Sequence, residues 1–485
     1  MSDTNAVRLG FVRESVAGEV PTTPVFRRFR FTGAPDLGQA PKTVESEEIL
    51  DDGQRTDLIV VATDIAGSAN FEMSFGAHDS LYEAALRGTF QARTSKTQPT
   101  HGLNTTTTTF ACSTTAGIAV GDLVASEGYV NAANNGLFAV TTVTANTSYT
   151  VTAIGGGAPG LVAETAPAGA VLRNVGRGFS SGISIGAPSG GLSVLTGVGT
   201  NFSTGLSLEA GDYIRLAGFS TPANNGYVRV VTITSDTVMT VDRLPTGFAA
   251  EAGTATNRVL LGERLKNATS RFTYTLQEMF TDIGTAPANT RQLLSGMGVN
   301  VLNLNIDSES VVTGQMSFIG QSAAYTIADV SGETFVEAEK WTPLNSSVDV
   351  GRIGEGGLPL DTINLPQAMK IEVNNNLAKR SAIGRIGGAG FRRGQFTVSG
   401  SLDCYFDDKS KVEKVIAGTE TSLDLQFNDT SFHGVVIDFP RVKFSSGAPP
   451  VPGRNDDVVV ALNWDALKDK TLLYTMKMMR FYRVA

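Results

Sequence analysis

Side chains that could do chemistry are few and scattered in this chain. Its three histidines, His78, His101 and His433, lie far apart, and none has another ligand at the short spacing of a metal site. The two cysteines, Cys112 and Cys404, fall in segments that we assign below to different domains, which disfavours a disulfide framework. No motif for a serine nucleophile, a zinc protease or a P-loop occurs. We therefore expect no enzyme, no metal and no cofactor.

The segment GRIGGAGFRRG (384–394) comes nearest to a ligand-binding motif. Glycine-rich turns bind dinucleotide phosphates when a helix follows them, whereas strands are predicted on both sides here. A loop is therefore favoured over a phosphate site. The adjacent acids Asp407 and Asp408 precede a predicted helix and should stabilise its N-terminus. Trp341 and Trp464 are expected in a core or an interface.

The composition indicates buried cores and little affinity for nucleic acid. The chain has 485 residues, of which 41% are hydrophobic and 18% charged, with a net charge of −8. A protein that coats nucleic acid carries clustered lysine and arginine, whereas a negative surface lets DNA slide past it. The length suggests two to four domains. We expect no signal peptide and no membrane insertion, because no apolar segment of the required length occurs.

Two segments far apart in the sequence predict the same short helix, GAHDSLYEAALRGT (76–89) and FDDKSKVEKVIAGT (406–419). The matches at an offset of 330 are Ser80 with Ser410, Glu83 with Glu413, and Gly88 with Gly418. The serine and the glutamate predict a capping box at each N-terminus, and the glycine predicts each C-terminal end. A chance match is the alternative, since capping boxes are common.

Strands with alternating polarity flank both helices in the same order, which favours a duplicated domain. Segments 26–33 and 368–374 predict equivalent strands, each followed by a long loop. After the helices, strands are expected at 271–280, 299–308 and 311–320 in the first copy, and at 422–429, 433–444 and 456–467 in the second. Each copy therefore has a strand, a short helix and three further strands.

A segment of different composition interrupts the first copy after its helix. No lysine occurs between Lys96 and Lys266, and short β-branched runs alternate with turn residues. Residues 121–151 align without gaps on residues 211–241, which indicates two tandem β modules. The Gly-Asp pair that opens each repeat predicts a turn before a strand. The Asn-Asn-Gly within each repeat predicts a tight hairpin turn with positive φ angles.

These segments, taken in order, resemble the major tail tube proteins of long-tailed, non-contractile bacteriophages. The segments that carry the resemblance are RLGFVRESVAGEVPTTPVFRRFRFTG, KTVESEEILDDGQ, DLIVVATDIAGSANFEMSFGAHDSLYEAALRGTF, FTDIG, VNVLNLNIDSESVVTGQMSFIG and the insert segment GDYIRLAGFSTPANNGYVRV. The resemblance covers nearly all of residues 7–330 and, more weakly, the C-terminal third. No single motif is diagnostic, but the ordered set is fairly specific.

The resemblance implies a mainly β fold of two tandem tail-tube β-sandwich domains, each with one short flanking helix, plus two small inserted all-β modules. The expected boundaries are 1–97 and 261–335 for tube domain 1, 98–175 and 176–260 for the inserted modules, and 336–485 for tube domain 2. In this family six tube domains surround a lumen, their inner sheets merge, and rings stack into a tube. Since this chain has two such domains, we infer three chains per ring.

The family also implies partners and a location. The tube holds the tape measure protein, adjoins tail terminator and distal tail proteins at its ends, and passes DNA into the host without binding it specifically. The protein would be part of the virion tail and would assemble in the host cytoplasm. The inserted modules should project from the outer wall, where they brace or decorate it, or contact the host surface.

Two sets of residues are candidates for assembly contacts. The early loops of the two copies carry opposite charges, so one could meet the other around a ring or between rings, although two independently solvated loops are equally compatible. The acidic loop has Glu45, Glu47, Glu48, Asp51 and Asp52, and the basic loop has Lys379, Arg380, Arg385, Arg392 and Arg393.

The second set could line the lumen. By alternation, Asn303, Asn305, Asp307 and Glu309 share one strand face, which is either lumenal or an ordinary solvent face. Two other classes of function compete with the tube. A β-rich adhesin or host-binding virion protein would use the repeated modules, and a glycan-cleaving tail enzyme would need paired carboxylates in a cleft.

Overall fold

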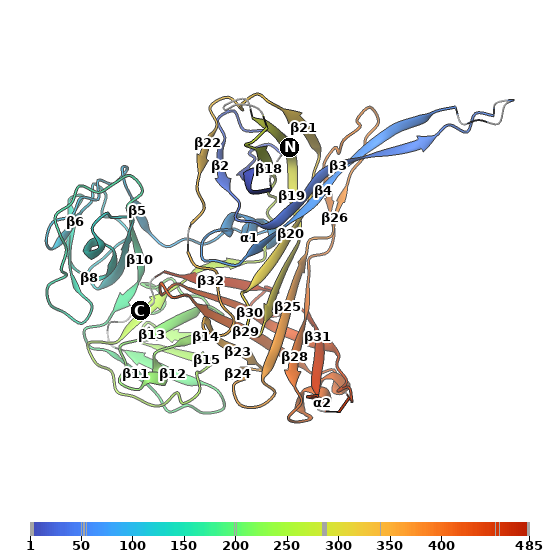
Figure 1. Ribbon diagram of the computed structural model, residues 1–485. Coiled ribbons are helices and arrows are strands. Elements are labelled where there is room, and N and C mark those ends of the chain that lie inside the picture. Colours follow the sequence, from blue (N-terminus) through green and yellow to red (C-terminus); the bar gives the residue numbers. More distant parts are fainter. Residues whose placement is uncertain are drawn as a thin grey trace.

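The computed structural model of the chain is mainly β, as predicted, and contains two copies of one domain (Figure 1). It describes residues 4–49, 51, 54, 56–197, 199, 201–283, 289–339, 341–451, 453–454 and 456–482. The first copy comprises β1 (Val7–Arg13), β2 (Val25–Arg28), β3 (Thr32–Glu45), β4 (Leu58–Glu72), α1 (Asp79–Ala85), β18 (Tyr274–Phe280), β19 (Thr290–Asp307), β20 (Thr313–Ile319), β21 (Ser322–Thr326) and β22 (Thr334–Val336), preceded by the 3-10 turn Thr4–Ala6.

The second copy repeats this order of elements. It comprises β23 (Val350–Glu355), β24 (Leu358–Pro359), β25 (Pro366–Asn374), β26 (Leu377–Lys379), β27 (Phe391–Arg393), β28 (Thr397–Tyr405), α2 (Ser410–Ala417), β29 (Glu420–Asn428), β30 (Gly434–Ser446), β31 (Val459–Ala466) and β32 (Lys477–Phe481). The predicted sequence of a strand, a short helix and three strands is thus confirmed in both copies.

The strand pairing of the two copies is the same. Antiparallel pairs link β1, β18, β19, β20, β4 and β3 in that order in the first copy. Antiparallel pairs link β23, β29, β30, β31, β28 and β25 in the second. The agreement of six strands in order and direction excludes a chance match of the two helices.

The two copies share one sheet and one hydrophobic core. Strand β19 of the first copy pairs with β25 of the second from Val301–Asn374 to Asp307–Ala368. Alternation of polar and apolar residues explains why this sheet has one buried face, since Leu302 and Leu304 are almost fully buried while Asn303 between them is not. A single cluster of buried side chains runs from Phe71 in the first copy to Trp464 in the second.

The insert lies between α1 and β18 and forms a separate sheet. Its strands are β5 (Ser95–Thr97), β6 (Thr109–Ala111), β7 (Asp122–Glu127), β8 (Gly136–Thr144), β9 (Ser148–Ala153), β10 (Val171–Gly178), β11 (Ile183–Ile185), β12 (Ser193–Gly197), β13 (Tyr213–Ala217), β14 (Tyr227–Ser235), β15 (Val238–Asp242) and β16 (Arg258–Leu261), with 3-10 turns at Ala132–Asn134 and Pro222–Asn224. Strands β10 and β16 join its two halves. The returning strand β17 (Glu263–Lys266) pairs with the C-terminal strand β32.

The predicted capping boxes do not form. The N-cap positions of α1 and α2 are His78 and Lys409, and neither side chain makes a capping hydrogen bond. Glu83 instead accepts a hydrogen bond from the backbone of Phe90 at 2.8 Å. At α2, Asp408 accepts hydrogen bonds from the backbone and hydroxyl of Ser410, which lower its pKa. The expected support from the paired acids is therefore confirmed for Asp408.

The helix ends agree with the prediction in one copy only. Gly418 adopts a left-handed conformation (φ +59°) and terminates α2 as a C-cap glycine does. In the first copy Arg87 takes the positive φ angle instead. Gly88 serves another purpose, because a Cβ atom there would lie 2.3 Å from the carbonyl oxygen of Lys266.

The prediction of tight hairpin turns at the two Asn-Asn-Gly segments is also wrong. Asn135 (φ −101°) and Asn225 (φ −92°) lack the positive φ of a tight hairpin. The first asparagine of each segment is fully buried and links two loops. Asn134 donates to Glu164 at 2.7 Å, and Asn224 donates to Glu251 at 2.8 Å. Each asparagine amide also donates to a loop carbonyl, Val162 for Asn134 and Ala249 for Asn224, so the buried amides have hydrogen-bond partners.

The Gly-Asp turns form as predicted. Gly121 and Gly211 have positive φ angles of 89° and 83° at the entries of β7 and β13. The following aspartates each accept a backbone hydrogen bond at 2.8 Å, Asp122 from Ala119 and Asp212 from Glu209. The two inserted modules therefore share their turn chemistry as well as their sequence.

Candidate functional site

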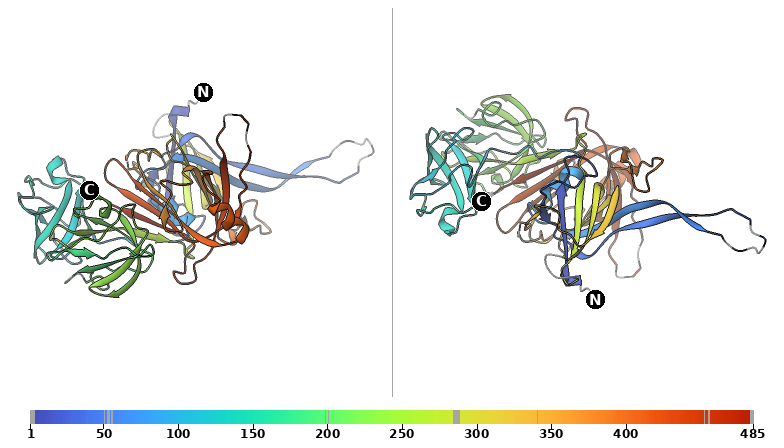
Figure 2. Two further views of the ribbon diagram at one scale, coloured as in Figure 1. Left: turned by 90° about the horizontal axis from the view of Figure 1, so that it is seen from below. Right: turned by 90° about the horizontal axis from the view of Figure 1, so that it is seen from above.

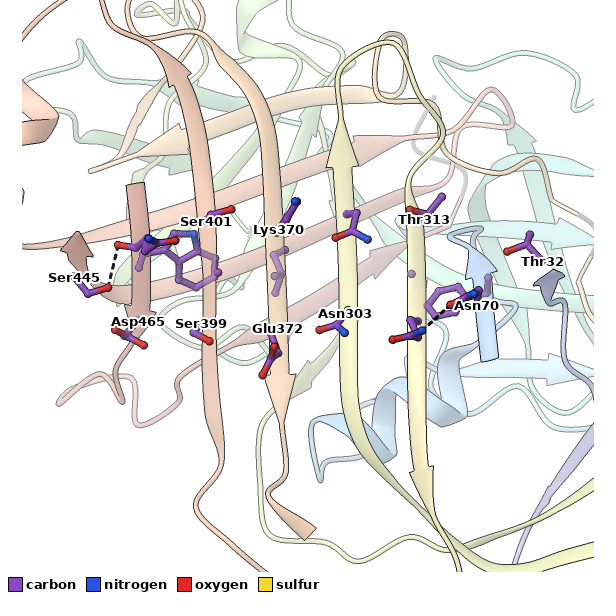
Figure 3. Close-up of a pocket in the computed structure, with 18 residues that line it drawn as sticks. Thr32, Asn70, Asn303, Thr313, Lys370, Glu372, Ser399, Ser401, Ser445 and Asp465 are labelled. Carbon is purple, nitrogen blue, oxygen red and sulfur yellow. Dashed lines mark hydrogen bonds between the residues drawn. The ribbon is translucent and has the colours of Figure 1, made fainter. Parts of the chain in front are cut away.

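A shallow hollow of about 770 Å³ lies on the polar face of the shared sheet (Figure 3). Strands of both copies line it side by side, so it belongs to neither domain alone. Its polar residues are Thr32, Asn70, Asn303, Asn305, Thr313, Gln315, Lys370, Glu372, Ser399, Ser401, Ser445, Asn463 and Asp465. Short amides, hydroxyls and few charges make this face hydrophilic without a strong field of either sign.

The polar residues form rows across the strands. One row starts at Thr32 and passes through Asn70, Gln315, Asn303, Glu372, Ser399 and Asp465 to Lys443, each residue directly opposite the next. Because side chains alternate between faces, a row of opposed residues points to one side of the sheet. The face is thus continuous across the junction of the two copies.

Two glycines on the opposite, buried face of this sheet allow aromatic rings to pack directly on its backbone. A Cβ atom on Gly314 would lie 2.4 Å from the ring of Phe71, and one on Gly400 would lie 2.6 Å from the ring of Trp464. Gly400 also approaches the backbone oxygen of Lys370, which a Cβ atom would meet at 2.0 Å. Each copy therefore has a ring packed over a glycine of the neighbouring strand, and both rings are almost fully buried.

Carboxylates outnumber cations at one end of the face. Asp307 of β19 and Asp403 of β28 both lie opposite Ala368 of β25. Burial raises the pKa of the Asp403 carboxyl, the charge of Lys370 lowers it, and the charge of Asp307 raises it further. A polyanion near this end would be repelled rather than bound.

The predicted lumenal residues occupy two different places. Asn303 and Asn305 line the hollow, and Asp307 is the exposed last residue of β19. Glu309 does not share the strand face, because β19 ends at Asp307 and Glu309 lies in the following turn with a φ of +55°. The alternation rule fails there because it holds only within a strand.

The predicted acidic loop is instead the end of a long hairpin. Strands β3 and β4 pair from Asp36–Ser68 to Glu45–Leu58 and form an arm that projects from the body (Figure 2). Glu45 ends β3, and Glu47, Glu48 and Asp51 are exposed beyond it. Asp52 lies outside the described residues. The strand predicted at 26–33 is interrupted between β2 and β3.

The hairpin was missed because β3 contains glycines and two prolines, Pro35 and Pro41, which usually argue against a strand. Proline is tolerated here because β4 is the pairing partner found for β3 in the described part of the chain. Pro35 and Pro41 lack a backbone N–H group, and the edge of β3 that faces away from β4 does not need one from them.

The predicted basic loop forms a second, shorter arm from β26 and β27. Lys379 lies in β26, Arg392 and Arg393 lie in β27, and Arg380 and Arg385 lie between the two strands. This arm packs along the first arm, since the Lys379 Nζ atom is 2.9 Å from Asp64 Oδ1 and the amide of Thr63 donates to the carbonyl of Ile386 at 2.8 Å. Lys379 at the base of the short arm and Ile386 in its loop thus contact the middle of the first arm, away from the acidic end.

The described residues contain no group of three or more metal-ligating side chains. His78 and His433 pack against aromatic rings instead. His78 is buried against aromatic rings, and burial lowers its pKa to about 4. His433 stacks on Phe75 and contacts the tilted ring of Trp341, with ring centroids 4.4 and 4.3 Å away. Both cysteines are buried and unpaired.

Sequence reasoning missed the buried charges that attach the insert to the second copy. Asp212 of the insert pairs with Lys477 of β32 at 2.9 Å, with both side chains almost fully buried. Arg352 of β23 is 2.8 Å from the buried Asp424 and donates to the carbonyl of Arg243 in the insert. No local signal marks such partners, because they lie far apart in the sequence.

The same interface includes apolar and aromatic contacts. A cluster of buried residues joins Leu123 and Tyr227 of the insert to Val436 and Phe481 of the second copy. Tyr213 donates a hydrogen bond to Asp438 at 3.0 Å. The insert therefore packs against the tube domain that it does not interrupt.

Two β-sandwich domains of one chain share a single sheet with a polar face, and the described residues hold no group of three or more metal-ligating side chains. The sequence matches the family of phage tail tube proteins twice, over residues 4–241 and 236–466. The chain belongs to this family and is a structural component of a phage tail.

The other comparisons add little. No curated protein matches the sequence. Among solved structures, the phage phi92 endosialidase aligns with 97% of this chain and 72% of its own, at 10% identity and a TM-score of 0.15. That score is too low to support any argument about fold or activity. No helix of the described residues has the length and apolar character needed to cross a membrane.

Proposed function

We propose that this protein polymerises into stacked rings that form the tail tube of a long-tailed, non-contractile phage, the conduit for DNA ejection. The observation that supports this most directly is the β19–β25 pair, which joins two tube domains edge to edge within one chain. Repetition of the same joint between chains would close a barrel and leave no open sheet edge.

Three chains would form one ring. The shared sheet has strand ends available at both sides of its polar face, Thr32 of β3 on one side and Ser445 and Ser446 of β30 on the other. Joining these two edges between neighbouring chains repeats the arrangement that β19 and β25 have within the chain. Six tube domains then surround the lumen as a pseudo-hexamer with threefold symmetry.

The polar face would line the lumen. Asn303 and Asn305 present neutral amides, and Asp307 adds a negative charge, so DNA would pass without being held. The tape measure protein would occupy the same lumen before ejection. Tail terminator and distal tail proteins would contact the two ends of the tube, and assembly would take place in the host cytoplasm.

The insert would lie outside the lumen and brace the wall. Its buried contacts with the second copy, including Asp212–Lys477 and Tyr213–Asp438, favour bracing over a freely mobile binding module. Host-surface contact by the outer part of the insert is compatible with this arrangement. An adhesin is the alternative function for the whole chain.

Electron microscopy of the purified protein, in negative stain and then in vitrified samples, tests this proposal. Hollow rings or tubes with the insert on the outside are expected, and a map should place Asn303 and Asn305 on the lumenal surface. Rings with these residues facing outward would contradict the proposed lumen. Compact particles without a central opening, together with binding to host-surface glycans, would favour the adhesin.

A further inference from the structure

A lysine and a carboxylate meet in the interior, where the insert contacts the second copy. Asp212 follows the positive-φ glycine Gly211 at the entry of β13, and Lys477 is the first residue of β32. The Lys477 Nζ atom lies 2.9 Å from Asp212 Oδ1, and both side chains are almost fully buried. A buried ion pair adds little to stability, because removing two charges from water costs about as much as their attraction gains. Attachment of the insert alone therefore does not explain why this contact is charged.

The lysine lies among aromatic and sulfur-containing side chains. Its Nζ atom is 4.6 Å from the centre of the Tyr474 ring. The backbone amide of Tyr213, the residue after Asp212, lies 3.1 Å from the sulfur of Met479 on β32. Burial lowers the pKa of the Lys477 ammonium group, although the carboxylates of Asp212 and Asp438 act in the opposite direction. The site therefore favours a neutral lysine amine, which is a nucleophile, in a position shielded from water.

The two oxygen atoms of the Asp212 carboxylate have different partners. Oδ1 contacts Lys477, whereas Oδ2 accepts hydrogen bonds from the backbone amide of Glu209 at 2.8 Å and from the guanidinium group of Arg264. Donors fixed on one oxygen stabilise the negative charge that develops there when a nucleophile adds to the carboxyl carbon. Oδ1, which lies beside the lysine nitrogen, is then the oxygen that can leave.

A second buried carboxylate faces the lysine from the neighbouring strand. Asp438 of β30 lies directly opposite Lys477 in the β30–β32 pair, so the two side chains point to the same side of the sheet. Tyr213 and Tyr474 donate hydrogen bonds to its two oxygens at 3.0 and 2.9 Å, and Arg229 lies 3.6 Å away. Asp438 is thus held in a fixed position beside the amine, where it can accept a proton.

We propose that Lys477 and Asp212 condense to an amide that joins the insert covalently to the second copy. A proton passes from the ammonium group to the carboxylate, and the neutral amine adds to the Cγ atom of Asp212. Asp438 then carries a proton from the nitrogen to Oδ1. The Cγ–Oδ1 bond breaks, Oδ1 leaves as water with two hydrogens from the lysine nitrogen, and Oδ2 remains as the amide carbonyl. One ammonium and one carboxylate thus give one amide and one water, and nothing is oxidised or reduced.

The bond would link parts of the chain that are far apart. Asp212 and Lys477 are separated by 265 positions, so an amide between them would close a long loop and restrict the unfolded chain, as a disulfide does. The insert would stay attached to the second copy even when its noncovalent contacts are broken. The reaction takes place within one chain and does not depend on the proposed assembly into rings.

Mass spectrometry of the denatured full-length protein tests the bond. The wild-type chain should be lighter than its sequence mass by one water molecule, whereas Lys477→Arg should have its full sequence mass. Trypsin should release a branched peptide from the wild type, in which residues 178–215 are joined to residues 471–480, because trypsin does not cleave after an acylated lysine. Asp438→Asn should slow the reaction, so that freshly made protein contains less of this peptide. The control Lys470→Arg, at an exposed lysine nearby, should keep the full mass deficit.

Three results would overturn the proposal. The first is a wild-type chain that keeps its full sequence mass even after prolonged incubation. The second is a deficit of one water that falls in any other peptide, and the third is a deficit that persists in Lys477→Arg. If Lys477→Arg does not fold, the wild-type mass and the branched peptide still decide, because both are measured on the denatured wild-type chain.

Discussion

Asn303 and Glu372 lie directly opposite each other in the β19–β25 pair, although one belongs to the first copy of the tube domain and the other to the second. The two tube domains are therefore joined, strand to strand, within a single chain. Neighbouring antiparallel residues have Cα atoms about 5 Å apart, which suits a disulfide. The register of the β19–β25 pair can therefore be tested by a disulfide, because the residue opposite Asn303 is known.

The variant Asn303→Cys/Glu372→Cys should form a disulfide within one chain. Oxidation should remove two free thiols and leave the mass of the denatured chain unchanged on a non-reducing gel. The matched pair Asn303→Cys/Ser399→Cys spans two strand spacings, about 10 Å, and should stay reduced. Cross-linking of the control but not of the first pair would contradict the register.

Positive charge on the polar face should convert a passive lumen into a binding surface. The triple variant Asn303→Lys/Asn305→Lys/Asn463→Lys should retain short DNA on assembled tubes, because lysine neutralises phosphates and releases counterions. Binding should fall steeply as salt rises from about 50 to about 200 mM. Glutamine at the same positions is the control, and equal DNA retention by wild type and the lysine variant would argue against a lumenal face.

His433 should make stability depend on pH at the junction of three parts of the chain. The side chain lies within 3.2 Å of Asp429 in the second copy and Glu127 in the insert, and it stacks on Phe75 and contacts Trp341. Burial alone would lower its pKa, but the hydrogen bonds to these two carboxylates raise the pKa above its ordinary value. The raised pKa means that folding favours the protonated form.

The stabilising effect is therefore complete below the unfolded pKa of about 6.5 and is lost as the pH rises through the higher folded pKa. Thermal unfolding should show a larger deficit for His433→Gln at about pH 6 than at about pH 9. The same deficit for His433→Gln at both pH values would mean that the ring contributes by packing alone.

Removing Arg352 should destabilise the second copy and loosen the insert, because this side chain pairs with Asp424 and also donates to the carbonyls of Arg243 and Leu244. Arg352→Met leaves the fully buried Asp424 without its 2.8 Å partner, which typically costs about 3–5 kcal/mol of unfolding free energy. Chemical denaturation measures this loss, and limited proteolysis should cut the linkers around the insert faster. The surface pair of Arg441 with Glu420 is a matched control, and Arg441→Met should change stability little.

The larger elements could be predicted from the sequence because their signals are periodic. Alternation identified β4, β19 and β28, and the repeated order of strand, helix and strands identified the duplication. Local capping motifs were less reliable predictors. Ser80 and Ser410 fit a capping box, yet Glu83 accepts from the backbone of Phe90 and Ser410 donates to Asp408, so these side chains bind other local groups.

Contacts between distant segments could not be predicted at all. The pair Asp212–Lys477 and the contact between the two arms through Asp64 and Lys379 depend on the packing of distant segments, which produces no periodic pattern in the sequence. The long arm was mistaken for a loop because Pro35 and Pro41 are tolerated on a free strand edge. Of the lumenal candidates, Asn303 and Asn305 lie on the polar face, whereas Glu309 falls in a turn.

The number of chains per ring tests the central claim most directly. Native mass spectrometry or mass photometry of isolated rings, with electron microscopy of the same sample, gives this number. Two tube domains per chain predict closed rings of three chains, about 150 kDa or three times the 51.0 kDa chain. Closed rings of six chains would contradict the pseudo-hexamer, and a protein that stays monomeric at every concentration would contradict the tube itself.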